Sequence, residues 1–146
     1  MPYRCATGRT SRFPRRADLI VAVLRHEIDE CVTASETLGA AHEPFDALSA
    51  WVERFTDFVS TKQGLAQALH SADPAYDGLP DALLASLELP VGGLLQRAVA
   101  SGAVRPGVAA RELLVAVALL YQPVPGEEHA FNQRLVRLFV EGLHAR

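Results

Sequence analysis

The residues closest to a metal-binding pattern lie in one short stretch, residues 26–30 (HEIDE). Two metal ligands four residues apart share one helix face, which is how the pattern His-Glu-x-x-His binds zinc. Glu30 stands where the second histidine would be, and the sequence offers no obvious third ligand. We therefore expect this stretch to be a solvated helix face, and we interpret residues 127–129 (EEH) in the same way, as the start of a helix.

The sequence also lacks the usual surroundings of a catalytic nucleophile and of a phosphate-binding loop. Gly92, Gly93 and Gly102 fall at breaks in helical patterns and not between a strand and a helix, where phosphate-binding loops form. Cys31 falls on an apolar helix face, which favours an inert buried thiol over a nucleophile. We expect no enzymatic activity, no metal site and no cofactor.

Length and composition indicate one globular domain. The chain has 146 residues, of which 49% are hydrophobic and 21% charged, enough to form a single core. Two cysteines, Cys5 and Cys31, cannot build a disulfide scaffold and are typical of free thiols in a reducing compartment. The longest apolar run, residues 113–121, is much shorter than the about 20 residues that cross a bilayer. We expect a cytoplasmic protein without a membrane segment.

The charge is divided unevenly along the chain. Residues 1–17 contain five arginines and no acidic residue, so residues 18–146 carry nine basic and seventeen acidic side chains, a net charge of −8. Phosphate contacts dominate nucleic-acid binding, and an acidic body serves that purpose poorly. Contact with DNA would have to come from the first seventeen residues or from a partner.

The positions of apolar residues predict helices almost throughout, because they recur every three or four residues. We expect an all-α fold of six to seven helices, with residues 1–13 as an irregular basic segment and residues 14–146 as one helical domain. The expected helices span residues 14–39, 44–60, 65–69, 80–101, 109–121 and 127–144.

Glycine and proline fix several of these boundaries. Gly39 is expected to end the first helix as a C′ glycine, and Gly102 to end the fourth. Residues 61–64 are expected to break the second helix, and residues 71–79 to form a loop. Pro90 removes a helical hydrogen bond, so we expect a kink or break at Leu89.

An aromatic stripe in the second expected helix has two interpretations. It is either part of the core or the wall of an apolar pocket between helices, where all-helical proteins bind small molecules. A bend at Pro90 would leave room for such a pocket, and His70 could supply a polar contact. The pocket hypothesis names Trp51, Phe55, Phe58, Leu69, His70, Leu84 and Leu94.

The last two expected helices suggest contact with a second chain. The helix at 109–121 is apolar nearly all round, so it must be buried on more than one side. Paired with the amphipathic helix at 127–144, it could form a four-helix bundle with the same pair of another copy, although both helices could instead be buried within one chain. The dimer hypothesis names Leu113, Val117, Leu120, Phe131, Leu135 and Leu138.

Three stretches carry a family resemblance. Residues 13–20 (FPRRADLI) resemble the end of the helix-turn-helix and the start of the next long helix in TetR-type transcriptional regulators. The middle stretch, residues 47–55 (ALSAWVERF) together with residues 61–66 (TKQGLA), is similar to the C-terminal domains of the SbtR-like branch. The last stretch, residues 94–106 (LLQRAVASGAVRP), is similar to the same domains and is the most specific of the three. The resemblance covers about residues 13–145.

The resemblance implies a domain that binds a small effector and forms a homodimer. Arg16 matches a family position near the DNA backbone, but Thr10 and Arg12 replace the family's Tyr and His. Only twelve residues precede Phe13, too few for the family's three N-terminal DNA-binding helices. We therefore expect this chain not to bind DNA specifically on its own, since one phosphate contact does not read a sequence. The alternative is a stand-alone helical interaction module without a ligand.

Overall fold

The computed structural model describes residues 16–69 and 73–145. Its elements are α2 (Arg16–Ala41), α3 (Pro44–Gly64), α4 (Ala66–Leu69), the 3-10 helix η1 (Pro74–Tyr76), α5 (Leu79–Ala100), α6 (Ala110–Leu120) and α7 (His129–Glu141). Five of these helices have eleven residues or more, and α4 and η1 are short segments between α3 and α5. The expected all-α class is confirmed: over the described ranges, the β structure amounts to an isolated bridge between Val104 and His144.

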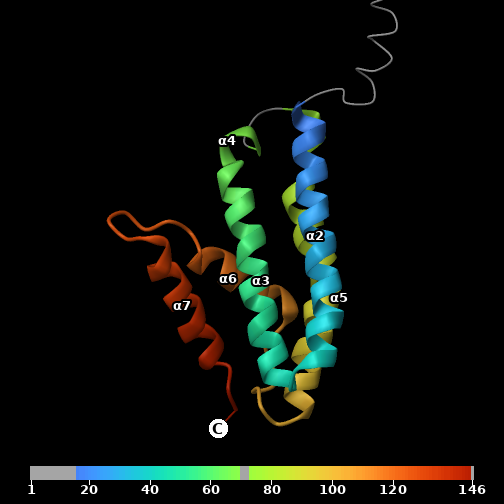
Figure 1. Ribbon diagram of the computed structural model, residues 1–146, viewed down its shortest axis with the longest axis vertical. Coiled ribbons are helices and arrows are strands. Elements are labelled where there is room, and N and C mark those ends of the chain that lie inside the picture. Colours follow the sequence, from blue (N-terminus) through green and yellow to red (C-terminus); the bar gives the residue numbers. More distant parts are fainter. Residues whose placement is uncertain (1–15, 70–72, 146) are drawn as a thin grey trace, which may run out of the picture.

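The long helices form a bundle to which α7 is attached at one side (Figure 1). Helices α2, α3 and α5 pack against one another, α6 packs against α5 and α3, and α7 contacts α6. The fully buried large side chains come from all the long helices except α7: Leu24, Leu48, Trp51, Val52, Phe55, Leu87, Val91, Leu94, Leu113, Leu114 and Val117, together with Val104 from the turn after α5.

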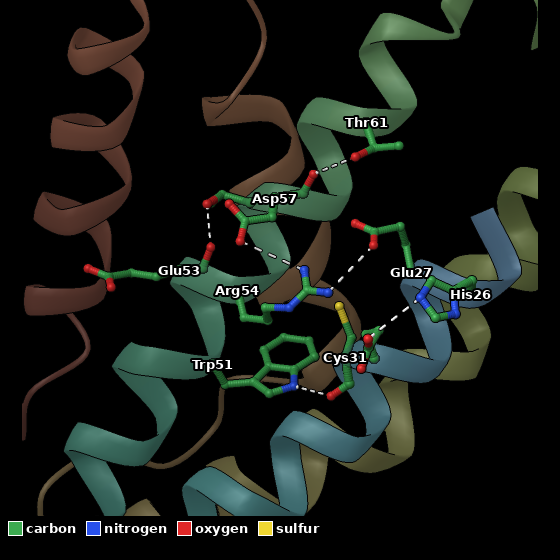
Figure 2. A network of polar contacts seen from close by, with 10 residues as sticks. His26, Glu27, Cys31, Trp51, Glu53, Arg54, Asp57 and Thr61 are labelled. Carbon is green, nitrogen blue, oxygen red and sulfur yellow. Dashed lines mark hydrogen bonds and ion pairs between the residues drawn. The ribbon is translucent and has the colours of Figure 1, made fainter. Parts of the chain in front are cut away.

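One buried hydrogen bond ties α2 to α3. The indole Nε1–H of Trp51 donates to the backbone carbonyl of Cys31 at 2.8 Å, and both side chains are fully buried (Figure 2). A buried Trp needs such a partner for its N–H group. Nearer the edge of the same contact, the Arg54 guanidinium lies 3.6 Å from the Glu27 carboxylate of α2 and 3.8 Å from that of Asp57.

The expected end of the first helix at Gly39 is wrong. Helix α2 continues to Ala41, and Gly39 does not have the positive φ of a C′ glycine. The N–H of His42 still donates to the Leu38 carbonyl at 3.1 Å, so the helical pattern passes through the glycine. A Cβ at Gly39 would lie 3.0 Å from the guanidinium nitrogens of Arg97, the end of a flexible and exposed side chain that can move away.

The expected break of α3 at residues 61–64 is also wrong. Helix α3 begins at Pro44, as predicted, but continues to Gly64, with the Thr61 hydroxyl bonded to the Asp57 carbonyl at 3.1 Å. The expected break at Pro90 is wrong as well, because α5 continues through it, with Leu87 and Val91 on either side fully buried. In both helices, the burial of apolar side chains outweighs the local effect, which is the low helix propensity of residues 61–64 in α3 and the hydrogen bond lost at Pro90 in α5. A break at Pro90 would have divided α5 into two helices. A kink at Leu89 stays a prediction.

The remaining boundaries that fall on described residues agree within a few residues, whereas the expected irregular segment 1–13, the helix start at residue 14 and the beginning of the expected loop at 71–79 lie outside the described residues. Gly102 ends α5 with φ +82°, as predicted, and the turn at Arg105–Gly107 has a positive φ at Gly107. Helix α7 begins at His129 and not at residue 127, and it ends at Glu141. The chain after α7 then pairs with the turn after α5, where the Arg105 N–H donates to the Leu143 carbonyl at 3.0 Å.

The segment Pro74–Ala100, which includes α5, is long and apolar enough to cross a membrane by length and composition alone. Core helices of soluble proteins pass the same test. Here α5 packs against α2, α3 and α6 and buries seven of its residues in the core. This burial accounts for part of its apolar character, since 33% of the apolar window is buried in the chain.

The two leucines that flank Glu88 give a matched test of this packing. Leu87 is fully buried, whereas Leu89 is 87% exposed on the same helix. Leu87→Ala should lower the free energy of unfolding by about 2–5 kcal/mol, because it leaves a cavity in the core. Leu89→Ala should change it by about 0.5 kcal/mol or less. Urea denaturation followed by circular dichroism measures both, and equal effects would contradict this assignment of the core.

Candidate functional site

A cavity of about 480 Å³ lies between α3, α4, α5 and α6. Its walls are mostly apolar, and its polar groups come from the last turn of α3, the first turn of α5 and Gln122, the second residue after α6. The lining residues are Phe55, Phe58, Val59, Lys62, Gln63, Ala66, Leu69, Pro80, Asp81, Leu83, Leu84, Val115, Ala118, Leu119 and Gln122.

Four of the seven residues named for a pocket line this cavity: Phe55, Phe58, Leu69 and Leu84. Trp51 and Leu94 are buried in the core away from it, because Trp51 faces α2. His70 lies outside the described residues. Helix α6 also supplies one wall of the cavity. The sequence pattern does not indicate this wall, because it places the apolar residues of α6 in a dimer interface.

The polar groups of the cavity fall into two kinds. The side chains of Gln63 and Gln122 are held by backbone carbonyls: Gln63 Nε2 donates to Tyr121 at 2.8 Å, and Gln122 Nε2 donates to Ala118 at 3.3 Å. In the described ranges, no ion pair joins Lys62 or Asp81 to another side chain. Lys62 lies in the last turn of α3 and Asp81 in the first turn of α5, where the helix dipoles favour their charges.

A second hollow, of about 460 Å³, lies between α3 and α7 and is lined about equally by polar and apolar surface. Glu53 extends from α3 toward it, whereas the Arg54 guanidinium is directed to α2, between Glu27 and Asp57 (Figure 2). Its lining residues are Ala50, Glu53, Arg54, Thr56, Asp57, Tyr121, Gln133, Val136 and Arg137. Because these charges are of both signs, this hollow is less suited to an apolar molecule than the cavity.

The six residues named for a dimer interface fall into two groups. Leu113 and Val117 are fully buried against their own chain and therefore present no surface to a partner. Leu120, Phe131 and Leu135 are half-buried, and Leu138 is 60% exposed. Helix α7 instead turns Asn132, Val136 and Val140 toward its own core.

An apolar groove of about 780 Å³ runs along α6 and the end of α7. It includes Leu119, which is 66% exposed, with the half-buried Val115 and Phe139 beside it. A groove of this character is typical of a surface that a partner covers. The sequence pattern did not single out Leu119, because in an all-apolar helix it looks like every other position.

The stretch at residues 26–30 forms an exposed pair, with the His26 and Glu30 side chains 3.6 Å apart. Within the described ranges, no three His, Cys, Asp or Glu side chains come together to hold a metal ion. Burial raises the pKa of the Cys31 thiol to about 11, although nearby Arg54 acts in the opposite direction. A buried thiol that stays protonated at neutral pH is a poor nucleophile.

These features define an all-helical regulatory domain of the TetR type. Residues 43–145 match the family model of the SbtR-like transcriptional regulator C-terminal domain, and the chain belongs to that TetR family of non-enzymatic regulators. The crystal structure of the TetR transcriptional regulator SCO0520 from Streptomyces coelicolor is similar, with a TM-score of 0.72 and 27% sequence identity, covering 96% of this chain and 81% of that chain. None of the curated proteins matches this chain significantly.

Proposed function

We propose that this chain is the effector-binding and dimerisation part of a TetR-family regulator. The observation that carries the proposal is the cavity of about 480 Å³ between α3, α4, α5 and α6. Small-molecule sites have volumes of roughly 300–1,000 Å³, apolar walls and a few polar groups that fix orientation. Here Phe58, Leu84 and Ala118 belong to the walls, and Lys62 and Asp81 supply charged groups.

An amphiphilic dye, with apolar aromatic rings and one sulfonate group, tests the cavity whatever the natural effector is. Anilinonaphthalene sulfonate should fluoresce more strongly with the wild-type protein, because its rings enter an apolar site. Ala118→Phe places a ring inside the cavity and should weaken dye binding by at least about tenfold. Ala85 is exposed on α5 and does not line the cavity, so Ala85→Phe serves as the matched control. Equal dye binding by the two variants would favour the alternative, an interaction module without a ligand.

The dimer proposal rests on the outer surface of α6 and α7. Leu119 of α6 and Leu138 of α7 are mostly exposed. Phe131 and Leu135 of α7 are only half-buried, although an amphipathic helix usually buries its large apolar side chains. Apolar surface removed from water contributes roughly 25 cal/mol per Å². A second copy of the same helix pair would cover these side chains, as in other two-fold dimers. We include Leu120, Phe131, Leu135 and Leu138 in the interface, and we leave out Leu113 and Val117.

Leu138→Asp should separate the dimer without unfolding the chain. The substitution places a charge in an apolar contact, which should raise the dimer dissociation constant at least about tenfold. The matched control is Leu89→Asp, at an exposed position on α5. Sedimentation equilibrium over a concentration series measures association, and circular dichroism monitors folding. A monomeric wild-type protein, or equal association of both variants, would overturn the proposal.

We further propose that this chain does not read DNA sequence by itself. Residues 18–146 carry a net charge of −8, and the family match covers the C-terminal domain. Arg16 is exposed at the start of α2 and could contact a phosphate, but phosphate contacts carry no sequence information.

A gel-shift titration across a salt series checks this prediction. The protein should bind the promoter beside its own gene and a scrambled duplex equally, and weakly, with affinity that falls as salt rises. A preference of about tenfold or more for the promoter would contradict the proposal, since it requires side chains that read base edges.

A further inference from the structure

Three consecutive backbone carbonyls at the end of α6 are held from two different sides. The side chain of Asn132, on α7, donates from Nδ2 to the carbonyls of Leu120 at 2.8 Å and Gln122 at 2.6 Å. The carbonyl between them, that of Tyr121, accepts from Gln63 Nε2, on α3, at 2.8 Å. The last carbonyls of a helix have no partner within the helix, so side chains from other elements can satisfy them.

This turn is one of two places where hydrogen bonds or ring stacking tie α7 to the rest of the described chain. At its start, α7 is tied by Asn132 and by the Tyr121 hydroxyl, which hydrogen-bonds His129. Beyond its end, Leu143 pairs with Arg105, and the ring of His144 stacks on Phe45. Between these places, α7 is held by the buried side chains of Val136 and Val140, and the second hollow separates it from α3. A change at the α6–α7 turn should therefore be felt along α7.

Gln63 belongs to the turn and to the cavity at once. Gln63 lines the cavity, as does Lys62, which has no ion-pair partner in the described ranges. An amide group carries two N–H donors, and an ammonium group carries three. These two side chains suit a ligand with an oxygen acceptor, above all a carboxylate, at one end of an apolar body. Asp81 lines the cavity from the first turn of α5, so the acidic end of such a ligand would lie at Lys62 and not at Asp81.

We propose that Gln63 couples the occupancy of the cavity to the position of α7. A carboxylate bound at Lys62 turns the Gln63 amide toward itself, so that Gln63 Nε2 leaves the Tyr121 carbonyl and the α6–α7 turn loosens when that bond is lost. The inference rests on the proposed function of the cavity and adds a ligand class and a regulatory contact. Since α7 carries part of the proposed dimer surface, the ligand would alter association as well.

The first test needs no ligand. Gln63→Met keeps the length of the side chain but removes its donors, and should speed amide hydrogen exchange in α7 by about threefold to tenfold, the effect of one lost hydrogen bond. Gln96→Met is the matched control, because Gln96 is exposed on α5 and lines no part of the cavity. Gln63→Lys restores a donor and should restore the protection. If Gln63→Met leaves exchange in α7 unchanged, the coupling is refuted.

The second test uses decanoate and decylamine, which share an alkyl chain and differ in the charged end. Decanoate should bind the wild-type protein more tightly by calorimetry and should speed exchange in α7, and in Gln63→Met it should have no further effect on α7. A merely structural role for Gln63 would leave the response to decanoate intact, and that result would overturn the proposal. Equal binding of the two compounds would refute the carboxylate assignment, while dye binding in the cavity would still support the proposed function.

Discussion

The arrangement depends on how α3 is fixed against α2. Trp51 and Phe55 bury large side chains at this contact, and the indole N–H of Trp51 bonds the Cys31 carbonyl at 2.8 Å inside the core. That bond allows Trp51 to be buried without an unsatisfied donor, and it sets the rotation of α3 about its own axis. With that rotation fixed, Phe58 and Gln63 line the cavity, and Glu53 and Asp57 border the hollow toward α7 (Figure 2).

The core and the cavity use the same helices for different purposes. Helix α5 buries Leu87 and Leu94 in the centre, while Leu84, one turn nearer its start, lines the cavity. The cavity lies beside α4, which is only four residues long, and two of its residues, Ala66 and Leu69, line it. A short helix covers less apolar surface of its neighbours than a long one does.

The end of α6 joins the cavity to the helix that faces outward. Gln63 and Gln122 both line the cavity, and each also takes part in a hydrogen bond of the α6–α7 turn: Gln63 donates to Tyr121, and the Gln122 carbonyl accepts from Asn132. A ligand in the cavity and a second copy of the chain on α7 would therefore both act on the hydrogen bonds of the α6–α7 turn. Two sites that bias one element are coupled in free energy, and the coupling is reciprocal.

The spacing of apolar residues along the chain predicts the helical class, most helix boundaries, the apolar residues of the core and four of the seven residues named for a pocket. It does so because apolar residues at helical spacing show which side of a helix faces inward. That spacing does not distinguish a filled interior from a cavity, so it assigns Trp51 and Leu94 to the pocket although both are core residues, and it does not show which apolar side of α7 faces its own chain. These points depend on the packing of the helices against one another, as do the hydrogen bonds of Gln63 and Asn132. Their partners are carbonyls on other helices, and a carbonyl is present at every residue, so no sequence pattern marks the one that is bound.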